Sequence, residues 1–236
     1  MKATLLVVFG FLFFLAIPSK SFADAPGFPP ARRAIIPIAA FAAEGDEQKL
    51  ENSLVAGLES GLSVNAIKEI LIQTYAYAGF PRSLSALEIF RKLVERRKAE
   101  GINDKSGSEP KTLSKDADKL AIGEKIQTEL VGRKIGGQLY DFAPEMNVFL
   151  REHLFCDIFS RGILSNQERE LATISILAAL PAPVQLASHL RVRRHIGLTL
   201  SQLKTLASCL SEKVSSRAGE LVDATLDKME FKNSEK

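Results

Sequence analysis

An internal repeat limits the fold of this 236-residue chain more than any other feature of its sequence. Residues 34–71 align without a gap with residues 170–207, at an offset of 136, and their apolar positions agree throughout. The two copies differ where the second carries ionisable side chains, because Glu170 faces Ala34 and His189 faces Ser53. The repeat predicts two similar halves, of which only the second holds a candidate acid–base pair.

Helical periodicity accounts for almost every segment after Ala31, and no stretch shows sustained strand alternation. The sequence predicts helices over residues 33–43, 48–60, 64–78, 83–98, 116–131, 144–160, 165–180 and 184–196, and a last one that opens at Thr199. Ser63, Ser83 and Ser165 are expected to cap three of these helices. The predicted class is all-α, with two tandem helical repeats.

The N-terminus has the pattern of a secretory signal. Lys2 precedes an apolar run over residues 5–17, and Ser21-Phe22-Ala23 provides small residues before a cleavage site. The run is short for a bilayer span, so we expect cleavage after Ala23, export to the periplasm and no stable membrane anchor afterwards. The expected organisation is a signal peptide at 1–23, a first repeat at 24–100, a linker and connecting helix at 101–137, and a second repeat at 138–236.

Composition argues against a nucleic-acid-binding protein. Without residues 1–23 the chain has 29 basic against 28 acidic side chains, and it contains no Trp and only 3 Tyr. A basic footprint and a base-stacking array are therefore both missing. The two cysteines, Cys156 and Cys209, form no Cys-x-x-Cys motif; after export they could pair, and buried free thiols are the equally weighted alternative.

The turn at Pro181-Ala182-Pro183 predicts a helical hairpin that carries Glu170 on one arm and His189 on the other. The rise per residue allows the two side chains to meet only if the helices tilt or the side chains reach. His189 shares an apolar helix face with Leu186 and Val192, whereas His195 lies on the polar face. A histidine on an apolar face is more often a core residue than a catalytic one, and the facing carboxylate favours catalysis.

The remaining histidine is His153. If it has no function, it is simply a polar residue at the edge of a helix. No two of the three histidines have the i, i+4 spacing typical of a metal site. We therefore expect no metal.

Several stretches together resemble tandem proteins of the carboxymuconolactone decarboxylase family, which is related to the alkyl hydroperoxidase D group. They are YAGFPRS at residues 77–83, HLF at 153–155, RELATIS at 169–175 and SHL at 188–190. The resemblance implies an all-helical homo-oligomer, such as a trimer or an assembly of paired repeats, with a small-molecule substrate and neither metal nor organic cofactor.

By this resemblance Glu170 and His189 are the catalytic pair of a lyase that acts on a small lactone or keto carboxylic acid. Arg169 or Arg82 would orient the substrate carboxylate, and Tyr77 and His153 are further candidates for substrate binding. The hydroperoxidase branch carries two thiols between its Glu and His, and these positions are Ala182 and Gln185 here. Peroxiredoxin-type thiol chemistry is therefore disfavoured, and a non-catalytic helical oligomer is the other alternative.

Overall fold

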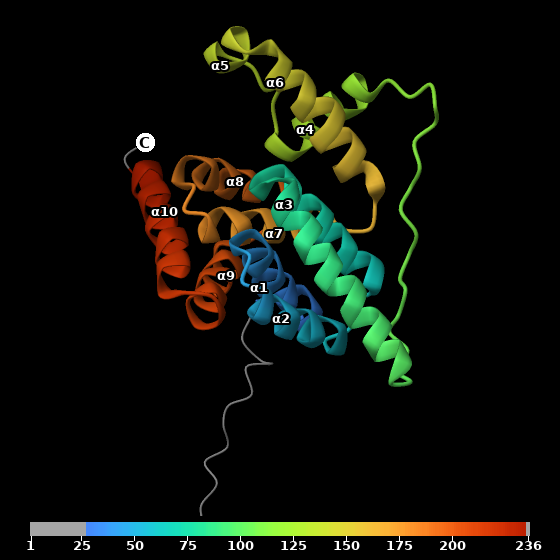
Figure 1. Ribbon diagram of the computed structural model, residues 1–236. Coiled ribbons are helices and arrows are strands. Elements are labelled where there is room, and N and C mark those ends of the chain that lie inside the picture. Colours follow the sequence, from blue (N-terminus) through green and yellow to red (C-terminus); the bar gives the residue numbers. More distant parts are fainter. Residues whose placement is uncertain (1–26, 235–236) are drawn as a thin grey trace, which may run out of the picture.

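The computed structural model describes residues 27–234, so the predicted signal segment lies outside the described residues. Every regular element in that range is a helix, which confirms the all-α class (Figure 1). The first half contains α1 (Pro30–Glu44), α2 (Glu47–Glu59) and α3 (Val64–Ala99). The second half contains α7 (Asn166–Ala179), α8 (Pro183–Ile196), α9 (Leu200–Lys213) and α10 (Ser216–Ser234).

The helix bounds repeat at the same offset as the sequence. α7, α8 and α9 each begin 136 residues after α1, α2 and α3. Their caps repeat as well, because the Ser63 side chain accepts a hydrogen bond from the Ala66 backbone and that of Thr199 accepts one from Gln202. The two copies therefore fold in the same way, helix by helix.

Helix α3 is bent at Gly79, whose backbone (φ 81°, ψ 163°) is non-helical. Glycine reaches this region without the steric cost that a Cβ brings. The second arm of α3 begins at Phe80, and its counterpart at the repeat offset is the start of α10. The predicted N-cap at Ser83 is wrong: its buried hydroxyl donates to the Leu71 carbonyl oxygen at 2.8 Å and so ties the two arms together.

A segment that occurs once in the chain separates the halves. It contains α4 (Lys119–Val131), α5 (Gln138–Phe142), α6 (Pro144–Phe149), the π-helix η2 (Leu150–Ile158) and the 3-10 turn η3 (Phe159–Arg161). The prediction of a single α-helix over 144–160 is therefore wrong, because the helix changes to the wider π form at Leu150. α4 packs closely on η2, since a Cβ at Gly123 would lie 1.8 Å from the Arg151 carbonyl oxygen.

The predicted linker is irregular, and it docks on the start of α3. The backbone N–H groups of Val64 and Asn65 donate to the carbonyl oxygens of Lys105 and Ser106. These bonds satisfy donors that the first turn of a helix leaves without an intrahelical partner. The linker therefore holds one end of α3 in place.

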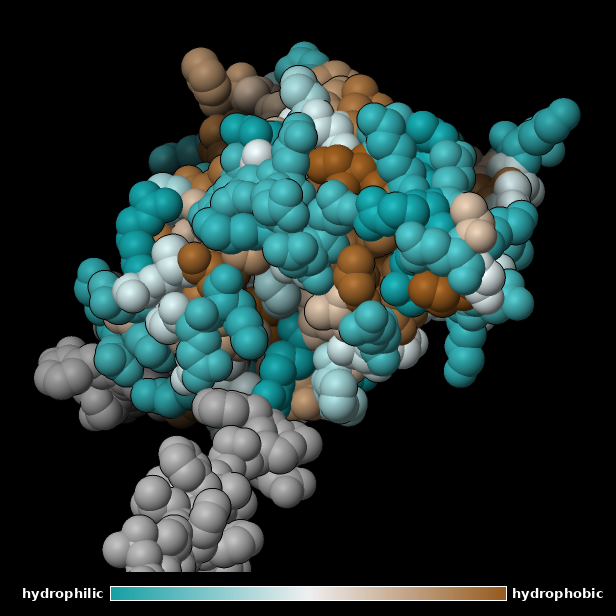
Figure 2. Space-filling view, turned by 60° about the horizontal axis from the view of Figure 1, so that its bottom comes forward, coloured by the Kyte–Doolittle hydropathy of each residue, from teal (hydrophilic) through white to brown (hydrophobic). Residues whose placement is uncertain are grey.

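The core is built on α1 and α7, which lie side by side in the middle of the molecule (Figure 1). Every residue of α7 from Arg169 to Ala179 is buried, and in α1 the buried residues run from Ile35 to Ala43 with one exception, Pro37. The face around α2 is mostly hydrophilic, with separate hydrophobic areas between the polar side chains (Figure 2). No helix among residues 27–234 is long and apolar enough to cross a bilayer.

Candidate acid–base site

Glu170 on α7 and His189 on α8 are in direct contact. Nδ1 of His189 lies 2.9 Å from Oε2 of Glu170 and 3.2 Å from Oε1. The Glu170 side chain is 3% exposed and that of His189 is 23% exposed. The helical hairpin therefore brings Glu170 and His189 into the contact that spacing alone did not decide, and the imidazole stays partly accessible.

Two opposing effects act on the protonation of His189. Burial alone would lower its pKa, since a charged imidazolium loses hydration. The charge of Glu170 and its hydrogen bond favour the charged form and prevail, so the pKa of His189 is raised above its usual value. The imidazole is thus poised to hold a proton and to donate it near neutral pH.

Tyr77 completes the immediate surroundings of the pair from α3. Its ring meets that of His189 edge to face, with the ring centroids 5.8 Å apart. Its hydroxyl is buried and has no hydrogen-bond partner among the described residues. Burial, and next the charge of Glu170, raise the pKa of Tyr77 far above the usual range, so the hydroxyl stays a proton donor.

Behind the pair lies a buried polar network that joins α3 to α7. Arg169 is fully buried and donates to Gln73 Oε1 at 2.9 Å and to Glu69 Oε2 at 3.2 Å. Gln73 returns hydrogen bonds to the Arg169 carbonyl oxygen and the Thr173 hydroxyl, both at 2.9 Å. Arg161 donates to the other Glu69 oxygen at 2.7 Å.

This network gives Arg169 a different place from the one expected of a substrate-binding cation. Its guanidinium is held inside the protein by Glu69 and Gln73, and its carbon Cζ lies 5.1 Å from the centre of the Phe159 ring. We interpret Arg169 as a positioning residue, because it fixes the turn of α7 that carries Glu170. Sequence reasoning missed Glu69 and Gln73, although two polar residues four apart on the apolar face of a helix were a visible signal.

The other two predicted substrate contacts lie apart from the pair. Arg82 is exposed and its guanidinium covers Gly45, in the turn between α1 and α2. His153 on η2 is 52% exposed, contacts Asp157 Oδ2 at 3.1 Å and lies beside the Tyr75 ring. No contact that the structure gives for either residue reaches Glu170 or His189. Of the predicted substrate residues, only Tyr77 touches the pair.

An apolar cluster from the segment between the repeats covers one flank of the site. Leu130 of α4 and Leu154, Ile158 and Phe159 of η2 and η3 pack with Val192 of α8, and Tyr77 contacts this cluster. His195 lies one helix turn beyond, exposed, as its polar face predicts. The site is therefore walled by α3, α7, α8 and the α4–η2 pair.

Neither cysteine is part of this site. Cys156 on η2 and Cys209 on α9 are both buried free thiols. Burial raises the pKa of Cys156, and it raises that of Cys209 to about 11. Both thiols are thus protonated at neutral pH. Among the described residues, no group of three or more His, Cys, Asp and Glu side chains is arranged to hold a metal ion.

The fold and the site define an all-helical protein in which a buried carboxylate holds a histidine between three helices. The sequence pattern of the carboxymuconolactone decarboxylase family matches residues 13–92, which contain much of the first repeat. A 4-carboxymuconolactone decarboxylase of Acinetobacter baylyi is 30% identical over 95 residues, which make up 39% of this chain and 71% of that protein. The chain belongs to the carboxymuconolactone decarboxylase family.

Proposed function

We propose that this protein is a cofactor-free carboxy-lyase that acts on a small lactone or keto carboxylic acid. The observation that carries the proposal is the contact between Glu170 and His189, with the Tyr77 ring against the imidazole. Family membership supports the same general activity. The similar Acinetobacter protein is named a decarboxylase, which supports the type of reaction. The substrate class of the present chain is our proposal.

The proposed reaction breaks one carbon–carbon bond and forms one carbon–hydrogen bond. The substrate carboxylate leaves as carbon dioxide, and the electron pair stays on the adjacent carbon, where a neighbouring carbonyl spreads the charge onto its oxygen. The Tyr77 hydroxyl donates a hydrogen bond to this oxygen. The imidazolium of His189 then gives its proton to the carbon, and water returns a proton to the imidazole.

Glu170 supports this step by holding His189 through Nδ1, so that Nε2 is the nitrogen available to the substrate. Its negative charge raises the pKa of the imidazole and so favours the protonated form that donates in this step. Within one chain, neither the Arg169 nor the Arg82 side chain contacts the pair. We therefore assign the hydrogen bond to the substrate carbonyl oxygen to Tyr77. Arg82, exposed on α3, remains a candidate carboxylate ligand only if a second copy brings it to the site.

The experiment compares His189→Gln with His195→Gln in a screen of lactone carboxylates and β-keto acids for carbon dioxide release. His189→Gln keeps much of the size but removes the proton, so turnover should fall by about 10²–10⁴-fold. His195→Gln, on the exposed face of the same helix, is the matched control and should keep full turnover. Loss of thermal stability in His189→Gln without a specific loss of turnover would instead favour a non-catalytic helical protein.

Thiol-dependent peroxide reduction is the competing function, and the raised pKa values of both thiols argue against it. Cys156→Ser should therefore leave lyase turnover and any peroxide consumption unchanged. A peroxidase signal that disappears in Cys156→Ser would overturn the lyase assignment.

We also propose that the protein is exported and works as a homo-oligomer. The N-terminal pattern around Lys2 and Ala23 supports cleavage before Asp24. Intact mass of protein from the native envelope fraction tests this, and full-length protein in the cytoplasm would refute it. Exposed apolar side chains on α5 and α6 support self-association, as argued below.

A further inference from the structure

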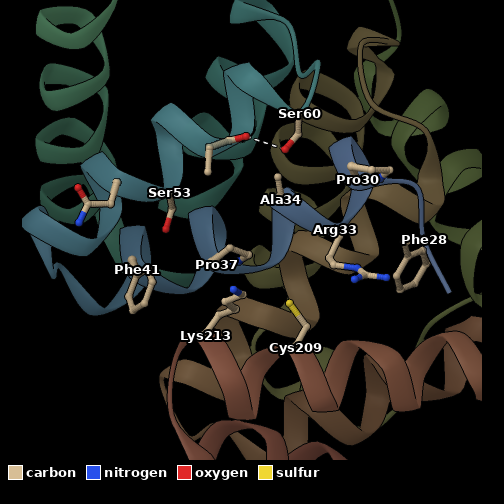
Figure 3. A pocket seen from close by; sticks show the side chains of 12 residues that line it. Phe28, Pro30, Arg33, Ala34, Pro37, Phe41, Ser53, Ser60, Cys209 and Lys213 are labelled. Carbon is tan, nitrogen blue, oxygen red and sulfur yellow. Dashed lines mark hydrogen bonds between the residues drawn. The ribbon is translucent and has the colours of Figure 1, made fainter. Parts of the chain in front are cut away.

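A cavity of about 620 Å³ lies between α1, α2 and α9 (Figure 3). Its volume is in the range typical of small-molecule sites. Apolar side chains form much of the wall, among them Phe28, Pro37 and Phe41. Figure 3 shows Lys213 and Cys209 of α9 reaching toward α1, which carries Arg33.

This cavity is the first-repeat counterpart of the acid–base site. The offset of 136 residues pairs its lining residues with those of the second site: Arg33 with Arg169, Ala34 with Glu170, Ser53 with His189, Cys209 with Gln73 and Lys213 with Tyr77. Each half contributes one helix to the site of the other half. Helix α3 completes the site on α7 and α8, and α9 completes the cavity on α1 and α2. The cavity thus corresponds to the acid–base site in its place in the repeat, but Ala34 and Ser53 stand where that site has its carboxylate and imidazole.

The two counterparts differ in how open they are, and the segment between the repeats explains why. At the second site, Val192 and Ile196 are covered by the apolar cluster of α4 and η2. Their counterparts, Ala56 and Ser60, line the cavity instead. The α4–η2 pair occurs once in the chain and packs at the site on α7 and α8, where η2 also contacts α3. The first repeat therefore keeps an open hollow in the corresponding place.

The two counterparts also differ in charge. Arg169 meets the buried carboxylate Glu69, and the position that corresponds to Glu69 is the neutral Thr205. Lys213 adds a second cation where the other site has Tyr77. Among the described residues that line the cavity, two are cationic and none is acidic. Burial is the main cause of the raised pKa of Cys209; Arg33 and Lys213 both oppose it, whereas Glu212, which is not among the lining residues, acts in the same direction as burial.

We propose that this cavity binds a small organic carboxylate with an apolar body, at a non-catalytic site separate from the Glu170–His189 pair. The apolar body lies against Phe41 and Pro37, and the carboxylate is directed to Arg33 and Lys213. A guanidinium and an ammonium together suit a carboxylate, since both are charged hydrogen-bond donors. The site stands on its own geometry and does not require the proposed lyase activity.

The test is a titration of the whole chain with 4-fluorophenylacetate, followed by ¹⁹F NMR. We expect saturable binding at millimolar concentration or below, and weaker binding of the neutral 4-fluorophenylacetamide. Lys213→Met should weaken binding about threefold to fivefold, because Lys213 is solvent-exposed and its charge is partly screened. Lys204→Met, on the same helix and paired with Asp227, is the matched control and should bind as the parent does.

A second variant tests the cavity apart from its charge. Ala56→Phe adds a ring from an exposed position, fills the hollow and keeps both cations, so binding should be lost while the circular dichroism spectrum is kept. His189→Gln should bind the probe normally, which separates this site from the acid–base site. The proposal fails if Lys213→Met binds as the parent does, if Ala56→Phe keeps binding, if the amide binds as well as the acid, or if no saturable binding occurs.

Discussion

Glu170 and His189 depend on each other, because a carboxylate with 3% of its side chain exposed has lost most of its hydration. Charge attraction and a hydrogen bond to the imidazole offset part of the free energy that the carboxylate loses with its hydration. The comparison of the two repeats found this pair because Ala34 and Ser53 occupy the same frame without it. The two repeats of this one chain thus differ at the candidate site, and that difference was enough to predict it from a single sequence.

Other parts of the site were not accessible from spacing. Arg169 and Glu69 are 100 residues apart, and their ion pair exists only because α3 crosses α7. The contact of Tyr77 with His189 has the same origin, since it joins the first half to the second. The resemblance placed Arg169 at the substrate, but Gln73 and Glu69 hold its guanidinium inside the protein, and consecutive residues on a helix point in different directions.

The protonation of His189 should depend on Glu170, and Glu170→Gln tests this. Loss of the charge leaves burial as the main effect, so the pKa of His189 should fall below its usual value. If the imidazolium is the proton donor, turnover declines as pH rises through this pKa, and the variant should lose turnover at lower pH than the parent does. NMR titration of His189 measures the shift, and an unchanged pKa would contradict the coupling.

The same pair has a signed effect on stability. In the parent the folded pKa of His189 is raised above the unfolded value of about 6.5. Its contribution to the free energy of unfolding is therefore fully present below about pH 6.5 and is lost as pH rises through the folded pKa. The free energy of unfolding of the parent relative to Glu170→Gln should therefore fall as pH rises through the folded pKa and become independent of pH above it, which denaturant unfolding of both proteins measures.

At the scale of helices, the sequence predicted well those bounds that have a local chemical cause. Ser165 with Glu168, and Thr199 with Gln202, form capping boxes where they were expected or where a helix was expected to open. Prediction failed at Ser83, where a contact across the bend decides: its hydroxyl donates to the Leu71 carbonyl oxygen and caps no helix. The helix predicted over 144–160 is a π-helix at residues 150–158, a change that no local sequence signal indicated.

The link between α3 and α7 can be tested at Glu69. Glu69→Gln keeps the shape of the side chain but leaves the buried guanidinium of Arg169 without its carboxylate. We expect a loss of about 3 kcal/mol in the free energy of unfolding, typical of a buried ion pair with one partner removed. Glu88→Gln, in an exposed ion pair on the same helix, is the control and should lose much less stability than Glu69→Gln does. Equal losses of stability in the two variants would show that the buried ion pair contributes no more than an exposed one.

At the scale of the whole molecule, the segment between the repeats carries α5 and α6 away from the core (Figure 1). Their exposed side chains are unusually apolar, with Leu139, Met146 and Phe149 at least half exposed and Phe142 88% exposed. Water contact with several large apolar groups on two short neighbouring helices is unfavourable. A second copy of the chain that covers this face would remove that cost.

The final prediction concerns this face, and Phe142→Asp tests it. A carboxylate at the centre of an apolar contact would remain buried without a partner, so the dissociation constant of the oligomer should rise at least about tenfold. Light scattering after size-exclusion chromatography gives the mass in solution at several protein concentrations. Val184→Asp places the same charge at an exposed apolar position on α8 and should leave the mass unchanged. If the parent is a monomer at every concentration, or if both variants dissociate alike, α5 and α6 are not the contact face.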